Sequence, residues 1–282
     1  MGPGERGLKR LIVTADDFGL SLPVNEAVEH AHTDGILTTT CLMVSGPAAQ
    51  DAVARARRLP DLAVGLHIVT VCGRSTLPTS EVPDLVDDDG CFDSNLVRAG
   101  FRYFFLPRVR RQLAKEIRAQ FEVFAETGLP LDHVNAHNHM HVHPTVLELI
   151  LSIGRDYGLS AVRVPYEPAN DGNARTFGEW FVGLWINRMK RTVQRAGLRF
   201  NDFVVGLRDT GRMDRNRLIP MLSTLPDGVS EVFCHPATGK WEGMDPAAHD
   251  YSFEEEYKAL LDADIRKLAS KSGIQLISFQ DI

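Results

Sequence analysis

The sequence is poor in cysteine, and none of its four cysteines forms a close CxxC pair: they are Cys41, Cys72, Cys91 and Cys234. This spacing indicates neither a zinc ribbon nor a disulfide framework. Long apolar runs are also lacking, because no stretch reaches the roughly 18 apolar residues that a membrane span needs. The N-terminal Met-Gly-Pro-Gly-Glu-Arg-Gly lacks the apolar core of a signal peptide. We therefore expect a cytoplasmic protein without a transmembrane helix.

The chain has no surplus of basic residues and no flexible linker. Its 31 Lys and Arg residues against 37 Asp and Glu residues give a formal net charge of -6, which argues against general nucleic-acid binding. No Ser-, Gly- or Pro-rich stretch divides the 282 residues, so we expect a single domain over 1–282. Two long insertions are expected within it, at about 72–108 and 166–200, and insertions of this length are usually functional loops or lids.

Short, apolar and β-branched runs alternate with helical patterns along the chain. Between the runs, apolar residues recur at helical spacing, most clearly over 109–126. Alternation of strand and helix predicts a parallel sheet and an α/β fold. The eight expected strands are 10–15, 37–44, 62–69, 132–137, 160–164, 203–206, 228–233 and 274–279.

Unusual polar residues lie at the carboxyl ends of five of these strands. A doubly wound sheet would spread them along a wide edge, whereas a closed (β/α) barrel brings strand ends together on one face. The sequence therefore favours a distorted (β/α) barrel similar to a TIM barrel. The residues concerned are Asp16, Asp17, His67, His137, Arg163 and His235.

A histidine-rich tract over 133–143 is the strongest single signal, with five histidines in eleven residues. If the chain stays extended beyond His137, then His137, His139 and His141 point to one face. A solvated loop without function is the alternative interpretation. Such an accidental tract should lack distant partners, and the polar residues at the other strand ends would supply them.

One carboxylate and two imidazoles leave coordination positions open, as in a catalytic metal site. Asp17, His67 and His137 would supply these ligands, although a lone histidine in an apolar strand, as His67 is, is more often a core residue. The expected cofactor is one divalent ion, with Zn²⁺ the first choice and Mn, Co, Ni, Fe or Mg as alternatives. Such an ion lowers the pKa of bound water and polarises a carbonyl.

Three further residues would complete a hydrolytic site. Asp16 is adjacent to the metal ligand and could take a proton from the attacking water. His235 could protonate a departing nitrogen, and Arg163 could fix the ionisation and orientation of Asp16 by a charge-assisted hydrogen bond.

Five motifs carry a resemblance to a known family. In chain order they are Ala15-Asp16-Asp17-Phe18-Gly19, Gly65-Leu66-His67, Asn135-Ala136-His137-Asn138-His139-Met140-His141, Val162-Arg163-Val164-Pro165 and Cys234-His235-Pro236. As a set, they resemble the YdjC-like deacetylases over nearly the whole chain. The resemblance implies a distorted barrel related to NodB-type polysaccharide deacetylases, a divalent metal, and hydrolysis of an N-acetyl group from an amino sugar.

The resemblance also implies the roles of individual residues. Asp17, His67 and His137 match the metal ligands, Asp16 the base and His235 the acid. The family commonly has Asp-Ser-His-His-His where this chain has Asn135-Ala136-His137-Asn138-His139, so a carboxylate and an imidazole are missing here. These departures bear on metal preference and substrate contacts.

Two aromatic and arginine-rich segments bear on the substrate. They are 96–111 and 177–191, and they are more similar to the HpnK branch of the family, which is associated with hopanoid biosynthesis. That branch implies an N-acetylglucosaminyl hopanoid substrate and peripheral contact with the inner face of the membrane. The alternatives are an aromatic stripe that is simply core and a soluble substrate such as diacetylchitobiose. The expected substrate-binding residues are His139, His141, Glu167, Trp180 and Trp185.

Other activities are compatible with some of these residues. A phosphoesterase with two metals would need more carboxylates nearby, and an Fe(II) oxygenase would need oxygen and a redox cosubstrate. A silent sugar or lipid carrier has no need of paired carboxylates beside histidines.

Overall fold

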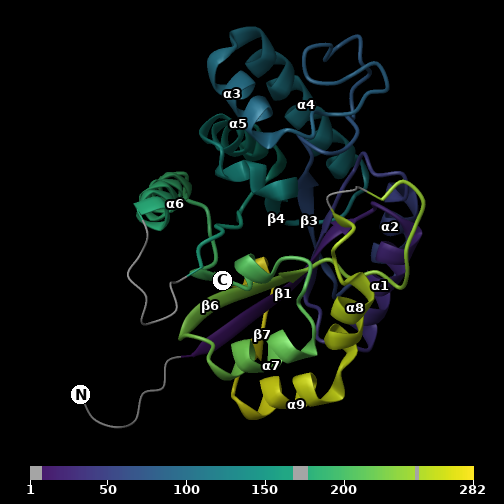
Figure 1. Ribbon diagram of the computed structural model, residues 1–282, viewed down its shortest axis with the longest axis vertical. Helices are drawn as coiled ribbons and strands as arrows, with labels where there is room; N and C mark the ends of the chain where they lie inside the picture. The colour runs from purple at the N-terminus through teal and green to yellow at the C-terminus, as the bar shows by residue number, and fades with distance from the viewer. Residues whose placement is uncertain (1–7, 168–176, 245–247) are drawn as a thin grey trace.

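A curled parallel sheet forms the centre of the protein (Figure 1). The computed structural model describes residues 8–167, 177–244 and 248–282, with only the backbone described over 177–182. The strands have the order β4-β3-β2-β1-β6-β5, and β7 also pairs with β1. Every ladder is parallel. The strands are β1 Lys9–Phe18, β2 Thr39–Leu42, β3 Ala63–Ile68, β4 Leu131–Ala136, β5 Phe203–Val205, β6 Gly228–Cys234 and β7 Gln275–Leu276.

The central strand β1 is buried over its last eight residues. Such a strand is covered on both faces, which explains its apolar run Leu11-Ile12-Val13. One edge of β1 pairs with β6, from Lys9 to Ala15. The other edge pairs first with β7, at Arg10 and Leu11, and then with β2 from Thr14 onward. Because all these strands run in one direction, their carboxyl ends lie at the same end of the sheet.

The expected strand over 160–164 is not a regular strand, and this prediction was wrong. The segment forms isolated parallel bridges, Val134 with Val162 and Ala161 with Arg199. Beyond them, the side-chain amide of Asn201 replaces the backbone ladder: it accepts from Val164 N (2.8 Å) and donates to Val164 O (2.9 Å). The segment thereby joins β4 to the chain before β5 and closes the sheet into the predicted distorted barrel. The expected last strand, 274–279, is likewise reduced to β7.

Helices cover the sheet, and three of them gather beyond β3 and β4 (Figure 1). These are α3 (Leu96–Phe105), α4 (Pro107–Glu126) and α5 (Pro144–Gly154), which pack on one another. Much of the expected insertion at 72–108 is thus loop followed by α3. No helix in the described part of the chain is both long and apolar enough to span a membrane. The remaining helices are α1 Leu22–Thr33, α2 Ala49–Ala56, α6 Phe177–Arg195, α7 Arg215–Ser223, α8 Phe253–Leu261 and α9 Ala263–Lys271.

The first histidine of the tract is a core residue. His133 is fully buried, stacks on Phe279 with 4.2 Å between ring centroids, and lies with Nδ1 2.9 Å from Asp132 Oδ2. On the neighbouring strand, Gly65 leaves room for it, since a Cβ atom there would come within 2.5 Å of the imidazole. The glycine therefore permits β3 and β4 to pair with an imidazole between them.

Candidate functional site

The carboxyl ends of β1, β3 and β4 meet at a cavity of about 730 Å³. Asp16 and Asp17 reach it from β1, His67 from β3, and His137 from the first position after β4. His235 follows β6 and lines the same cavity. This volume lies within the range of small-molecule sites. The strand-end residues predicted from the sequence are therefore brought together.

Asp17, His67 and His137 are arranged as metal ligands. Asp17 Oδ1 lies 3.2 Å from His67 Nε2 and 3.0 Å from His137 Nδ1. One ligand atom from each residue lies within 4.8 Å of the others. Zinc holds nitrogen and oxygen ligands at about 2.0–2.1 Å in a tetrahedron, so two of its ligand atoms are about 3.3 Å apart. These donor atoms therefore fit one small divalent ion.

The tautomer of His67 supports the same assignment. His67 Nδ1 lies 2.7 Å from Asn135 Oδ1, while Asn135 Nδ2 donates to Asp16 Oδ1 at 3.2 Å. Because this donation fixes the orientation of the amide, the Asn135 oxygen accepts and His67 Nδ1 carries the hydrogen. His67 Nε2 then presents its lone pair towards Asp17, as a metal ligand must. Asn135, where the sequence departs from the common family motif, thus orients the His67 ring.

Asp16 is bound by the predicted partner, Arg163. Arg163 Nη1 donates to Asp16 Oδ2 at 2.7 Å and Nη2 donates to Asp16 Oδ1 at 2.8 Å. Burial alone raises the pKa of Asp16, but the positive charge of Arg163 outweighs it and, helped by His67 and His235, holds this pKa well below its usual range. Asp16 is therefore ionised and held in one orientation by Arg163.

Arg163 also binds a second carboxylate, Glu231, which the sequence analysis missed. Arg163 Nε and Nη2 donate to Glu231 Oε1 at 2.9 and 2.7 Å, and Thr14 Oγ1 donates to it at 2.6 Å. Both Arg163 and Glu231 are fully buried, and the guanidinium lies 5.0 Å from the centre of the Phe233 ring. A charged residue inside the apolar run 228–234 was the available signal.

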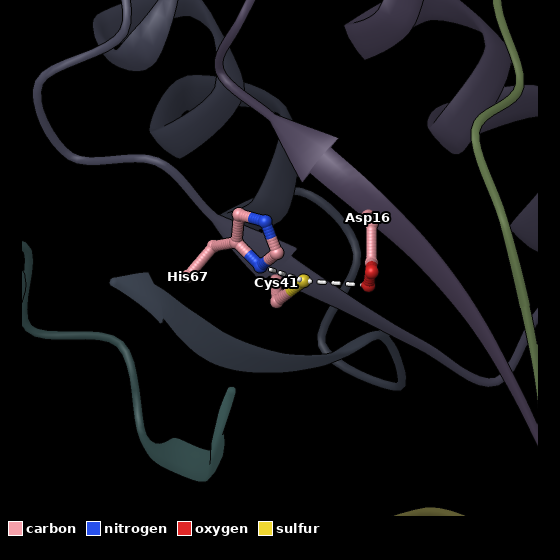
Figure 2. A group of neighbouring side chains, drawn as sticks. All are labelled: Asp16, Cys41 and His67. Atoms are coloured by element: carbon pink, nitrogen blue, oxygen red, sulfur yellow. Dashed lines mark hydrogen bonds between the residues drawn. The ribbon is translucent and has the colours of Figure 1, made fainter. Parts of the chain in front are cut away.

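Cys41 lies between Asp16 and His67 (Figure 2). Its Sγ is 3.0 Å from Asp16 Oδ1 and 3.1 Å from His67 Nδ1, so these three residues are a second possible metal group. Burial raises the pKa of the Cys41 thiol well above its usual range, and the Asp16 carboxylate adds to this. His67 Nδ1 donates its hydrogen to Asn135 Oδ1, so it has no lone pair for a metal in this group, whereas His67 Nε2 faces Asp17. The group with Asp17 is therefore the better candidate for a metal site.

The tract after His137 is not extended, which overturns the expected alternation. Residues His137–Val142 form a 3₁₀ segment in which Asn138 and His139 have left-handed backbone, with φ of 51° and 52°. His139 still lines the cavity, and its ring packs edge-on against Phe233. Burial, reinforced by Arg163, lowers the pKa of His139 to about 3, so its imidazole is neutral.

His141 is turned away from the cavity. It is fully buried, and its Nδ1 accepts a hydrogen bond from Ala136 N at 3.1 Å. It does not line the cavity, so the structure offers it no contact with a substrate there. The turn at Asn138 and His139 is the physical reason, since it breaks the alternation on which the expectation depended.

His235 lies on the side of the cavity formed by β6. Its ring packs near Tyr251, with 5.1 Å between centroids, and its Nδ1 is buried without a hydrogen-bond partner among the described residues. The backbone N–H of His235 donates to Glu256, a buried carboxylate that sequence reasoning also missed. Burial raises the pKa of Glu256. The backbone of His235 is therefore anchored, and its ring borders the cavity.

The other expected substrate-binding residues lie elsewhere. Glu167 accepts backbone hydrogen bonds from Gly206 and Arg208, at 2.9 and 3.3 Å, and does not line the main cavity. Trp185 donates from Nε1 to Val142 O at 2.8 Å and lines a second cavity. The side chain of Trp180 lies outside the described residues.

Aromatic rings that the sequence analysis did not select line the main cavity instead. Trp241 is half-buried there and packs edge-on against Phe253, with ring centroids 5.1 Å apart. Phe92 reaches the cavity from the 72–108 insertion. Flat aromatic faces beside carboxylates and imidazoles suit a ligand with both apolar and polar faces, as a sugar ring has.

The comparison with protein families agrees with these motifs. Residues 10–271 match the family model described as YdjC-like protein. The chain belongs to this family.

Its relatives include proteins named carbohydrate deacetylase. That of Vibrio vulnificus (strain YJ016) is 32% identical over 279 residues, covering 97% of this chain and 96% of the relative. That of Brevibacillus brevis is 29% identical over 273 residues, covering 97% and 99%. A crystal structure from Enterococcus faecalis V583, provisionally named as a cellobiose-phosphate cleavage protein, has a TM-score of 0.73 and 23% identity, covering 97% of this chain and 98% of that one. At this identity, the structural similarity establishes the fold alone.

Proposed function

We propose that this YdjC-like protein is a metal-dependent carbohydrate deacetylase, which hydrolyses the N-acetyl group of an amino sugar to acetate and the free amine. The observation that carries the proposal is the donor group of Asp17, His67 and His137 beside the ionised Asp16. The names of the relatives support the choice of reaction.

In this proposal, each residue has a separate task. Asp17, His67 and His137 would hold a divalent ion, which would supply polarisation of the amide carbonyl and a lowered pKa for a bound water. Asp16 accepts a proton from the attacking water, through Oδ2. Among the described residues, Oδ2 accepts one hydrogen bond, from Arg163 Nη1, whereas Oδ1 accepts three. His235 donates a proton to the departing amine from across the cavity.

Removing the metal should abolish acetate release. We expect a chelator to stop turnover of an N-acetylated sugar and Zn²⁺, Mn²⁺ or Co²⁺ to restore it. In Asp17→Asn the added metal should not restore turnover, because one charged ligand is lost, while asparagine tolerates the left-handed backbone at this position (φ 65°). Acetate release and metal content by mass spectrometry are the measurements.

Glu242→Gln is the matched control for the metal experiment. Glu242 also lines the cavity but does not belong to the donor group. Its replacement should leave metal content unchanged. Full activity in the chelated wild-type protein, or normal metal content in Asp17→Asn, would contradict the proposed centre.

Trp241 should contribute to binding of the sugar. We expect Trp241→Ala to raise KM by about tenfold, because a stacked aromatic contact contributes roughly 0.5–1.5 kcal/mol beyond its buried area. The value of kcat should change less, since this ring does not touch the reacting amide. Steady-state kinetics on diacetylchitobiose would measure both. A fall in kcat at unchanged KM would rule out this role.

The finer proposal is that the sugar is attached to a lipid, as in the HpnK branch, with N-acetylglucosaminyl bacteriohopanetetrol as substrate and peripheral contact with a membrane. A specific observation favours it: α3 exposes Val97, Phe101, Phe104 and Phe105, with exposed fractions from 56% to 83%. The same helix begins at Leu96, which lines the main cavity. An apolar surface that starts at the substrate cavity suits an apolar aglycone. A soluble oligosaccharide, such as diacetylchitobiose, remains the second candidate.

The two substrates can be separated by a change on α3. Phe101→Ser with Phe104→Ser should reduce deacetylation of the hopanoid in vesicles by about tenfold or more, because each phenyl group contributes about 1.5–3 kcal/mol when buried. Activity on diacetylchitobiose should persist. Mass spectrometry would follow loss of the acetyl group. The control is Leu8→Ser. Leu8 has a similar exposed fraction (61%) and lies just before the amino end of β1, whereas the cavity is at the carboxyl end. Equal turnover of the hopanoid by both variants would exclude the role of α3. Turnover of diacetylchitobiose but not of the hopanoid by the wild-type protein would exclude the lipid proposal in favour of the soluble substrate.

A further inference from the structure

A second cavity, of about 440 Å³, lies between α5 and α6. It shares no lining residue with the main cavity. The proposed deacetylase reaction uses none of its residues. Its walls are formed mainly by side chains of α5 and α6 and by Val142 and Arg155, which lie before and after α5.

Three exposed arginines line this cavity. Arg155 follows the end of α5, and Arg188 and Arg195 project from α6, seven residues apart and therefore on one helix face. Within the described parts of the chain, none of the three forms an ion pair, whereas Arg215 and Arg217 each bind two carboxylates. In a chain of net charge -6, unpaired guanidinium groups gathered around one cavity are unusual.

One carboxylate lines the cavity but belongs to another pair. Glu148 binds Arg110 at 2.8 Å. The three arginines thus outnumber the acidic residues of the wall, and the cavity has a net positive charge. Anions are attracted to such a site, and guanidinium groups bind phosphate oxygens in a bidentate manner.

The rest of the wall suits an organic ligand. Leu147, Leu151 and Met189 supply apolar surface, and Trp185 supplies an aromatic face whose position is fixed by the hydrogen bond to Val142 O. A ligand with a phosphate group and an apolar or sugar portion would satisfy both parts of this wall.

We propose that the cavity between α5 and α6 binds a phosphate group carried by an organic molecule. The volume is sufficient for a small ligand. The same chemistry is offered by a free phosphate ester and by the headgroup of an anionic phospholipid. The inference goes beyond the proposed deacetylase activity, and it does not depend on the metal centre.

The test compares two variants of α6. Arg188→Gln with Arg195→Gln removes two guanidinium groups from the cavity, whereas Arg191→Gln removes an exposed arginine of the same helix that does not line it. Calorimetric titration with glycerol phosphate, and flotation with vesicles of phosphatidylglycerol or of phosphatidylcholine, would measure binding in the full chain. Thermal unfolding would establish that both variants remain folded.

We expect the double variant to weaken binding at least about tenfold and Arg191→Gln to change it less than about twofold. Saturable binding of glycerol phosphate with this dependence identifies a free phosphate ester. Binding of phosphatidylglycerol vesicles alone, with the same dependence, identifies the lipid headgroup. Equal weakening by both variants, or no binding of either probe, would overturn the inference.

Discussion

Replacing Asp16 by asparagine is expected to lower kcat for acetate release by about 10²- to 10⁴-fold, the usual contribution of a positioned general base. The amide cannot accept the proton that the attacking water must lose. The change is nearly isosteric, and Arg163 retains its bonds to Glu231. Asp16 is not a member of the assigned metal group, so we expect metal content to stay at the wild-type level.

The comparison with Asp17→Asn makes this result specific. The two carboxylates are adjacent in sequence, but only Asp17 Oδ1 faces both imidazoles. We therefore expect Asp16→Asn to bind metal without turnover and Asp17→Asn to lose both. Metal analysis, thermal unfolding and acetate release on the same preparations would distinguish these states. Wild-type turnover by Asp16→Asn would exclude its role as base, and loss of metal would mean that Asp16 is a ligand.

Positions in the main chain were the most predictable part of this site. Asp16, His67, His137 and His235 follow or end apolar runs, and parallel strands place such ends on one side of a sheet. The sequence pattern alone therefore predicts which residues meet. The structure brings the donor atoms of Asp17, His67 and His137 together, and their role as metal ligands stays a prediction.

Side-chain direction was less predictable. The expectation for His141 depended on an extended chain, and the left-handed residues Asn138 and His139 turned it into the core. Histidines that are two positions apart on a turn do not share the alternation of a strand. The pairing of Glu231 with Arg163 was not predicted for a related reason. An apolar run such as 228–234 indicates burial, but it does not show which residue a buried charged side chain binds.

The position of the aromatic and basic residues of α6 was also hard to predict from the sequence. An aromatic stripe followed by basic residues is typical of an interfacial helix, and the sequence analysis weighed it against a core stripe. In the structure, Trp185 is half-buried and donates to Val142. An exposed apolar cluster lies on α3, where Phe101, Phe104 and Phe105 gather, and among the described side chains of α6 Leu184 is also exposed. Composition alone does not tell which face of a helix is covered.

Arg163→Met is expected to lower the free energy of unfolding by about 3–5 kcal/mol, because removing one partner leaves buried charge uncompensated. The Arg163 side chain has no accessible surface. It forms ion pairs with two buried carboxylates, Asp16 and Glu231. The variant retains both of these carboxylates close together. Denaturant unfolding would measure the loss. As a control, Arg217→Met breaks partly exposed pairs with Asp209 and Asp214 and should cost about 1 kcal/mol or less.

A second substitution tests whether the carboxylates cause this loss. Glu231→Gln in the Arg163→Met background removes one uncompensated charge, so the double variant should be more stable than Arg163→Met alone. The same Glu231→Gln change in the wild type breaks a bond to Arg163 and should destabilise it. The opposite signs follow only if buried charge, rather than lost packing, dominates at Arg163. Destabilisation of the same size in both backgrounds would instead assign the cost of Arg163→Met to packing against Phe233.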